Sequence, residues 1–281
     1  MAQVIKSQLL LNKREVNKMT SLLKQYSNSS NFMARVELNR RFGTNPYKWT
    51  SWIFDQIKFK KDARVLELGC GNGILWKSNL QKIQGDAHIL LSDFSEGMLD
   101  DAKLTLGDAA ERFDYEVINA EQIPYPDNSF DVVVANLMLY HVPDRNKAIS
   151  EISRVLKSDG VLYATTFGLN YMKELSDLVS NYDKSANCSL EPVARAFGLE
   201  NGEKQLSEHF ENVKLIKYSD GLEVTEAKPL VNYVLSFTRV KDIINGDKII
   251  DFENYITNIL NENGKIQIKK ESGMFIAENM H

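Results

Sequence analysis

The chain has 281 residues, of which 43% are hydrophobic and 26% are charged, and these values are typical of one large globular domain or of a domain with an appendage. No apolar run approaches the ~20 residues of a membrane span, and the first residues lack the apolar segment of a secretory signal. Two cysteines and four scattered histidines have neither the number of a disulfide framework nor the spacing of a zinc site. We therefore expect a cytoplasmic protein that holds no metal.

The charge is unevenly distributed along the chain. The net charge is −4, but residues 1–61 carry +9 and residues 62–281 carry −13. A basic arm beside an acidic body either binds an anionic partner or is a solvated helical arm that docks on the body. No block of five like charges occurs, which favours the second interpretation.

The first 61 residues are expected to form a helical arm or lid. The first helix is amphipathic, and the last contains Tyr47, Trp49 and Trp52, which either cover a bound ligand or pack the arm onto the body. Residues 28–31 and 42–47 are breaks, because they are rich in Asn, Ser, Gly and Pro. The predicted helices span residues 4–26, 32–42 and 47–57.

From residue 63 the pattern changes to alternating strands and helices. The predicted strands are 64–68, 88–92, 115–119, 131–136 and 161–167. The helices between them are 74–82, 96–106 and 146–156. Such alternation predicts an α/β fold in which helices cover both faces of a mostly parallel sheet.

The last third of the chain is expected to complete one domain over residues 62–281. Its predicted elements are helices over 171–182 and 191–210, a strand at 212–218, helices within 227–263, and a strand at 265–279 with a bulge at Gly273. The last two strands are therefore separated by a helical insertion of about residues 226–264. Tyr233 and Phe237 lie four apart in this insertion, and we expect them on one helical face, where they wall a substrate pocket or pack the insertion.

A glycine-rich turn follows the first strand of the alternating region. The stretch "ARVLELGCGNGILW" spans residues 63–76 and has glycines at 69, 71 and 73. A dinucleotide fingerprint needs G-x-G-x-x-G, and Ile74 stands at the place of its third glycine, which disfavours NAD and FAD. Closely spaced glycines let a ligand approach the backbone. Glu67 precedes them and favours a ligand with positive charge over a pyrophosphate.

This turn and two later stretches resemble the motifs of class I S-adenosylmethionine-dependent methyltransferases. "VLELGCGNG" is similar to the first motif, "ILLSDFSEGML" (89–99) to the second, and "INAEQIPYPDNSFDVVVANLMLYHVPD" (118–144) to the third and fourth. The resemblance covers residues 63–167 and is strongest to the small-molecule type, which includes quinone-biosynthesis enzymes. It implies a seven-stranded sheet whose last strand is antiparallel, and S-adenosyl-L-methionine as the cofactor.

The resemblance also implies roles for single residues. The turn formed by Gly69, Cys70, Gly71 and Gly73 would pass under the methionine part of the cofactor. Glu67 would hold that turn or face the cofactor's amino group. Asp93, 20 residues after Gly73, would accept hydrogen bonds from both ribose hydroxyls.

The adenine and the sulfonium would meet residues farther along the chain. Phe94 and Met98 would flank the adenine ring, while Asn119 and Ala120 would bind its edge, with Asn119 where the family commonly has Asp. Asn136 would lie near the sulfonium. Each role has a structural alternative: strand-end caps for Glu67 and Asp93, core packing for Phe94 and Met98, and the start of a turn for Asn136.

The expected reaction is a direct displacement of the methyl group onto an O, N or C nucleophile of a small organic molecule. A general base is needed only where that nucleophile is protonated. His141 and Tyr140 follow the fourth strand and are the candidates, with a structural residue at a helix start as the alternative for His141. Two other functions remain open, an RNA or protein methyltransferase that uses the basic arm and a regulator that binds the cofactor without catalysis.

Overall fold

A computed structural model describes residues 30–83 and 85–278, so the helix expected at 4–26 lies outside the described residues. The first described helices are α3 (Ser30–Phe42) and α4 (Trp49–Gln56), close to the predicted bounds. Within the described residues no helix is both long and apolar enough to cross a membrane.

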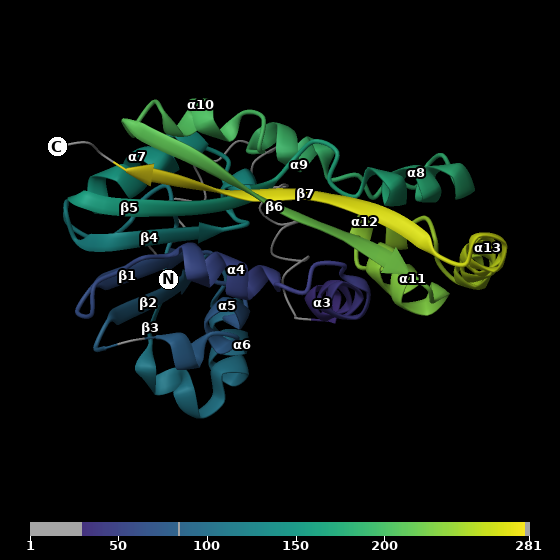
Figure 1. Cartoon of the computed structure of the whole chain (residues 1–281), viewed down its shortest axis with the longest axis horizontal. Coiled ribbons are helices and arrows are strands. Elements are labelled where there is room, and N and C mark those ends of the chain that lie inside the picture. The colour runs from purple at the N-terminus through teal and green to yellow at the C-terminus, as the bar shows by residue number, and fades with distance from the viewer. Residues whose placement is uncertain (1–29, 84, 279–281) are drawn as a thin grey trace, which may run out of the picture.

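Seven strands form one sheet in the order β3-β2-β1-β4-β5-β7-β6 (Figure 1). Strands β1 to β5 run parallel, and β7 is antiparallel to both of its neighbours, β5 and β6. This topology confirms the predicted fold class. The bounds are β1 Arg64–Leu68, β2 His88–Asp93, β3 Asp114–Val117, β4 Phe130–Asn136, β5 Leu156–Phe167, β6 Asn212–Val224 and β7 Ile266–Glu278.

Helices cover both faces of the sheet, as the apolar runs of its strands require. On one face α4, α5 (Ile74–Lys77) and α6 (Glu96–Leu106) enclose a core around Trp76 and Val134. On the other face α7 (Arg145–Val155), α9 (Glu191–Ala196) and α10 (Gly202–Leu206) enclose a core around Val133 and Phe275. Short 3-10 helices at Leu80–Lys82, Gly107–Arg112 and Leu139–His141 complete the connections.

The hairpin of β6 and β7 extends well past the rest of the sheet. Pairing between β5 and β7 ends at Phe167 and Ser272, but β6 and β7 remain paired for six further positions, up to Val224 and Ile266. At ~3.3 Å per residue this carries the hairpin ~20 Å beyond the end of β5. The insertion therefore begins far from the end of β5. Its place in the sequence, between the last two strands, suggests instead that it lies directly above the edge of the sheet.

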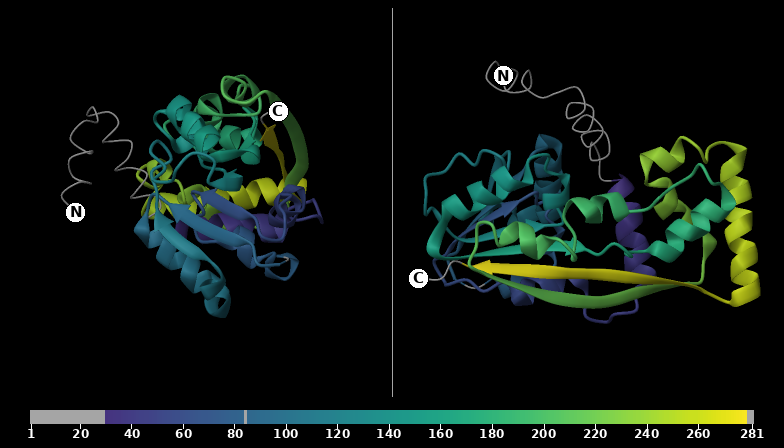
Figure 2. Two further views of the ribbon diagram at one scale, coloured as in Figure 1. Left: turned by 90° about the vertical axis from the view of Figure 1, so that its left-hand side faces the viewer. Right: turned by 90° about the horizontal axis from the view of Figure 1, so that it is seen from above.

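The end of this hairpin carries a second cluster of helices, which we call the lobe (Figures 1 and 2). Its buried core is separate from the two cores that flank the sheet and includes Leu38, Leu230 and Phe252. The lobe joins the inserted helices to two helices from elsewhere in the chain. Its members are α3, α8 (Lys173–Tyr182), α11 (Ala227–Leu235), α12 (Thr238–Lys241) and α13 (Asp247–Asn263).

Two local predictions are wrong. Gly273 makes no bulge, because it pairs in register with Thr166 on one side and Lys217 on the other, and a side chain there would lie 2.6 Å from the Ile216 carbonyl oxygen. Phe237 does not share a helix with Tyr233, since α11 ends at Leu235. Their rings still contact, with centroids 5.7 Å apart.

Candidate functional site

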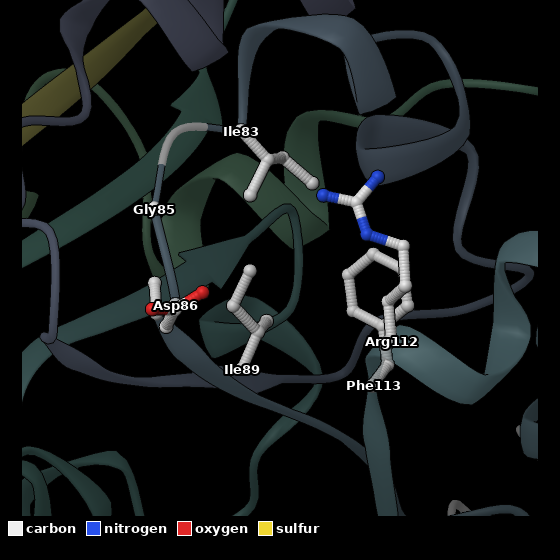
Figure 3. A pocket seen from close by; sticks show the side chains of 7 residues that line it. Ile83, Gly85, Asp86, Ile89, Arg112 and Phe113 are labelled. Atoms are coloured by element: carbon white, nitrogen blue, oxygen red, sulfur yellow. The ribbon is translucent and has the colours of Figure 1, made fainter.

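The predicted site residues gather at one edge of the sheet. Because β1, β2, β4 and β5 are parallel, their carboxyl ends at Leu68, Asp93, Asn136 and Phe167 lie at the same edge, the edge that faces the lobe. Ligands in open α/β sheets bind at this edge. The hollow in Figure 3, lined by residues such as Ile83, Asp86 and Arg112, lies at the opposite edge, where β2 begins, and contains none of the predicted site residues.

The three glycines of the turn share a positive φ but differ in what surrounds them. All have φ between +55° and +70°, a region that favours glycine. A side chain at Gly69 would lie 2.8 Å from Met138, and one at Gly73 would lie 3.3 Å from Ala102 of α6. At Gly71 a Cβ would meet no protein atom within 4 Å. Only Gly71 therefore leaves open space beside the backbone that a ligand can occupy.

Asp93 ties the glycine turn to the start of α6. Its Oδ2 accepts a hydrogen bond from the Gly71 amide at 3.0 Å, and its Oδ1 accepts one from the Ser95 amide at 2.9 Å. An ionised carboxylate offers about four acceptor positions, so Asp93 retains acceptor capacity for a ligand hydroxyl group besides its backbone donors. Burial raises the pKa of Asp93, and the amide donors oppose that shift. The strand-end role and the ribose role are thus compatible.

Glu67 is a buried carboxyl with one unsatisfied oxygen. Its side chain has no exposed surface, its Oε2 accepts a hydrogen bond from the Trp76 indole at 2.5 Å, and its Oε1 has no partner among the described residues. Burial raises the pKa of Glu67 to about 8, and the charge of Asp93 adds to the shift. A buried polar group without a partner is costly, and such groups are frequent at functional sites.

These features fit S-adenosylmethionine, whose sulfonium and ammonium groups are both positive. A cationic donor beside Glu67 and Asp93 would satisfy the free oxygen and offset the repulsion between two acids. The open space at Gly71 gives such a ligand access to the backbone. Cys70, between Gly69 and Gly71 in the turn, is buried. Burial raises the pKa of its thiol well above the usual value, so Cys70 is an inert packing residue.

The predicted adenine-binding residues lie beside the ends of β2 and β3. Phe94 is 41% exposed, an unusual degree for a large apolar ring, whereas Met98 in α6 is buried. Asn119 is exposed and accepts a hydrogen bond from the Glu121 amide at 3.0 Å through its Oδ1, and Ala120 is buried. Phe94 thus presents an exposed face on which a ring can stack, whereas Met98 is part of the buried interior.

Thr165 is a residue of this edge that the sequence analysis missed. Its hydroxyl donates to Asn136 Oδ1 at 2.7 Å and accepts from the Leu137 amide at 3.0 Å. Leu137 has a φ of +53°, a strained conformation for a branched residue, and this pair of hydrogen bonds holds it. A polar residue inside the apolar strand "VLYATTF" was the available signal.

Tyr140 and His141 lie at the same edge and begin a row of aromatic rings. The row runs from His141 to Tyr140 at 4.5 Å, to Phe167 at 5.0 Å and to Tyr171 at 4.9 Å between centroids. Tyr140 is buried, whereas His141 and Tyr171 are partly exposed. Tyr171 packs against both the sheet core and the lobe core. The row therefore leads from the carboxyl ends of β4 and β5 into the lobe.

The aromatic residues of α4 and the insertion serve packing. Trp49 stacks on Trp52 at 5.3 Å, and both contact Tyr218 of β6. Tyr233 and Phe237 are 4% and 6% exposed within the lobe core. No group of three potential metal ligands occurs in the part of the chain that the structure describes.

Comparison with known proteins agrees with this geometry. A family model described as a methyltransferase domain matches residues 66–164. The ubiquinone/menaquinone biosynthesis C-methyltransferase UbiE of Vibrio cholerae is 32% identical over 137 residues, which cover 48% of this chain and 52% of that protein. The chain thus spans about half the length of the relatives that it matches.

Two solved structures share the fold at low sequence identity. YcgJ of Bacillus subtilis has a TM-score of 0.56 and 19% identity, over 83% of this chain and 98% of that one. Phosphoethanolamine N-methyltransferase 2 of Haemonchus contortus, solved with phosphomonomethylethanolamine and S-adenosylhomocysteine, has a TM-score of 0.58 and 18% identity, over 93% of this chain and 59% of that one. Residues 66–164 of this chain match a methyltransferase domain, as the resemblance of its motifs to class I S-adenosylmethionine-dependent enzymes implies.

Proposed function

We propose that the whole protein transfers a methyl group from S-adenosylmethionine to a nucleophile of a small organic molecule. The observation that carries this proposal is the combination of open space at Gly71 with two neighbouring acids, the buried Glu67 and the partly buried Asp93. We propose residues 62–281 as the catalytic domain, including the insertion at about 226–264, and residues 1–61 as an arm. The UbiE relatives act in quinone biosynthesis by name, which supports a small-molecule acceptor.

In this proposal the carboxyl edge binds the cofactor along its length. The turn of Gly69, Cys70, Gly71 and Gly73 supports its methionine part, with Glu67 Oε1 as acceptor for its ammonium group. Asp93 accepts from the ribose hydroxyls through the acceptor capacity that its backbone donors leave free. The adenine lies against Phe94 above Met98, near Asn119 and Ala120, and Asn136 faces the sulfonium.

When bound, S-adenosylmethionine supplies a methyl group on a sulfonium, a leaving group that is already activated. The protein then contributes position and a site from which water is excluded. Asn136 is held by Thr165, and the strained Leu137 follows it, so the backbone beside the reacting groups is fixed. His141 and Tyr140 are the candidates for removing a proton from the acceptor, because they lie where the aromatic row meets the ends of β4 and β5.

A screen of cell metabolites with methyl-labelled S-adenosylmethionine tests the proposed reaction. We expect one small-molecule fraction to gain the labelled methyl group, and mass spectrometry would identify the product. The same incubation with purified RNA and with total protein serves as the comparison. Label in RNA or protein, and none in small molecules, would contradict the proposal in favour of a macromolecular acceptor.

A further inference from the structure

Two arginines of the lobe lie on one aromatic ring. The guanidinium carbon of Arg35, from α3, is 4.6 Å from the centre of the Phe237 ring, and that of Arg239, from α12, is 5.8 Å from the same centre. Arg35 contributes to a lowered pKa of Arg239, for which the partial burial of the Arg239 guanidinium is the larger cause. Two positive charges on one ring repel each other, and an anion bound between them would offset that repulsion.

The described part of the chain supplies no such anion. Neither Arg35 nor Arg239 forms an ion pair with a described carboxylate, whereas Arg41 on the same helix α3 pairs with Glu226. The first 29 residues contain one acid, Glu15, and five basic residues, so their composition does not offer a surplus of negative charge. The unpaired charge is therefore a property of this site and not of helix α3 in general.

The hydrogen bonds of both arginines leave donors unused. Arg35 donates through Nε to the Ser236 hydroxyl at 2.9 Å and through Nη2 to the Ser236 carbonyl at 3.4 Å. Arg239 donates through Nη2 to the Ser189 carbonyl. Each guanidinium has five N–H groups in a planar fork that matches a carboxylate or phosphate. A role in capping α11 accounts for the contacts of Arg35 with Ser236, but not for a second guanidinium on the same ring.

The two arginines lie in the lobe, into which the aromatic row leads from the carboxyl edge of the sheet. Tyr171 packs against the lobe core that contains Tyr233 and Phe237, and the ring centroids of Tyr233 and Phe237 are 5.7 Å apart. Tyr171 is the last ring of the row that begins at His141 and Tyr140. A molecule whose ring lies along this row would extend toward the lobe core around Phe237, the ring on which Arg35 lies.

We propose that Arg35 and Arg239 bind an oxyanion, a carboxylate or a phosphate monoester, on the methyl acceptor. The acceptor is thus an apolar or aromatic molecule with an anionic group at the end remote from the reacting nucleophile. This inference rests on the proposed methyltransferase function and defines its substrate class. Phe237 positions both guanidiniums, and the aromatic row accommodates the apolar part.

Binding of three small ring compounds to the full-length protein tests the proposal. Phenyl phosphate, benzoate and neutral benzamide are titrated at constant ionic strength, with saturating S-adenosylhomocysteine, and binding is followed by NMR. We expect phenyl phosphate or benzoate to bind at least about tenfold more tightly than benzamide, and the tighter of the two distinguishes a phosphate from a carboxylate. The R35Q/R239Q variant loses this preference, and R41Q, whose arginine is paired with Glu226, retains it.

Equal affinities for all three compounds, or an unchanged preference in R35Q/R239Q, would overturn the proposal. R239Q alone provides a second test, because Arg239 is exposed and its substitution disturbs little of the lobe core. Affinity for S-adenosylhomocysteine, measured in the same variants, is expected to stay unchanged. If the wild-type protein binds S-adenosylhomocysteine but shows no preference for the anionic compounds, only this inference is refuted. If the wild-type protein does not bind S-adenosylhomocysteine at all, the proposed function is refuted.

Discussion

Gly71 is the residue at which conformation and ligand access can be separated by experiment. Its φ is +55° and Gly246, in the lobe, has a φ of +53°, and an added Cβ at either position meets no protein atom within 4 Å. Substitution by Ala is expected to lower stability at both positions, because both impose a positive φ on a side chain, and more at Gly246, whose ψ of −130° lies outside the left-handed helical region. Calorimetry should detect weaker S-adenosylhomocysteine binding for G71A alone. Equal affinities in G71A and G246A would place the cofactor away from this turn.

Glu67 makes stability depend on pH in a calculable direction. In the unfolded chain its carboxyl loses its proton near pH 4.5, whereas the folded protein keeps it to about pH 8. The folded state therefore binds more protons between these values, and the free energy of unfolding contributed by Glu67 falls as the pH rises through this window. E67Q removes this dependence, so its advantage in stability over wild type grows from pH 5 to pH 8 in urea titrations. Parallel pH profiles of the two proteins would contradict the assignment.

Asp93 is expected to combine cofactor binding with support of the glycine turn. D93A should weaken S-adenosylhomocysteine binding by about 1.5–3 kcal/mol, because the ribose loses a charged acceptor and the Gly71 amide loses its partner. Asp131 is the matched control, since its carboxylate accepts from the Arg64 amide at 2.8 Å at the opposite edge of the sheet. D131A should lower the melting temperature without changing the dissociation constant. Equal dissociation constants for D93A and wild type would show that the ribose is held elsewhere.

The sequence predicted those site residues whose role depends on their type and on their spacing along the chain. The spacing of Gly69, Gly71, Gly73 and Asp93 predicted which residues gather at the edge. It did not predict that Gly69 and Gly73 are required by Met138 and Ala102, since these contacts join segments far apart in the chain. Thr165 was missed for the same reason.

The β6–β7 hairpin is the element whose length the sequence did not predict. The expected strand ended at residue 218, and the next residues, "SDG" (219–221), are typical of a turn. In the structure β6 continues to Val224, and Asp220 pairs across the strands with Lys270. The side chains of this ion pair are 6% and 8% exposed, and Asp220 also accepts from the Asn45 amide at 3.0 Å. A buried pair thus maintains the strand through residues that local preference would place in a turn.

Removal of one partner of this pair should destabilise the hairpin. K270M leaves Asp220 as an uncompensated buried charge and is expected to lower the free energy of unfolding by about 3 kcal/mol. The double variant D220N/K270M should recover most of this loss, because no isolated charge remains. Urea unfolding of wild type, both single variants and the double variant measures the coupling. Additive losses would indicate that the pair contributes nothing to the stability of the extension.

For the whole molecule, the sequence predicted the parallel half of the sheet better than the lobe. The apolar runs and the alternation of helices and strands determine β1 to β5 locally. The lobe assembles α3, α8 and the insertion from three separate segments, whose association depends on tertiary packing around residues such as Leu38 and Phe252. The insertion was therefore predicted as helical, but its distance from the sheet edge was not.

Binding of S-adenosylmethionine at the carboxyl edge of this sheet is tested by isothermal titration calorimetry of the full-length protein with S-adenosylhomocysteine, and separately with NAD. Saturable binding of one S-adenosylhomocysteine per chain is predicted, weakened in G71A and D93A and retained in G246A and D131A. NAD should give no such response, because Ile74 takes the place of the third fingerprint glycine. Saturable binding of NAD without any response to S-adenosylhomocysteine would contradict the account.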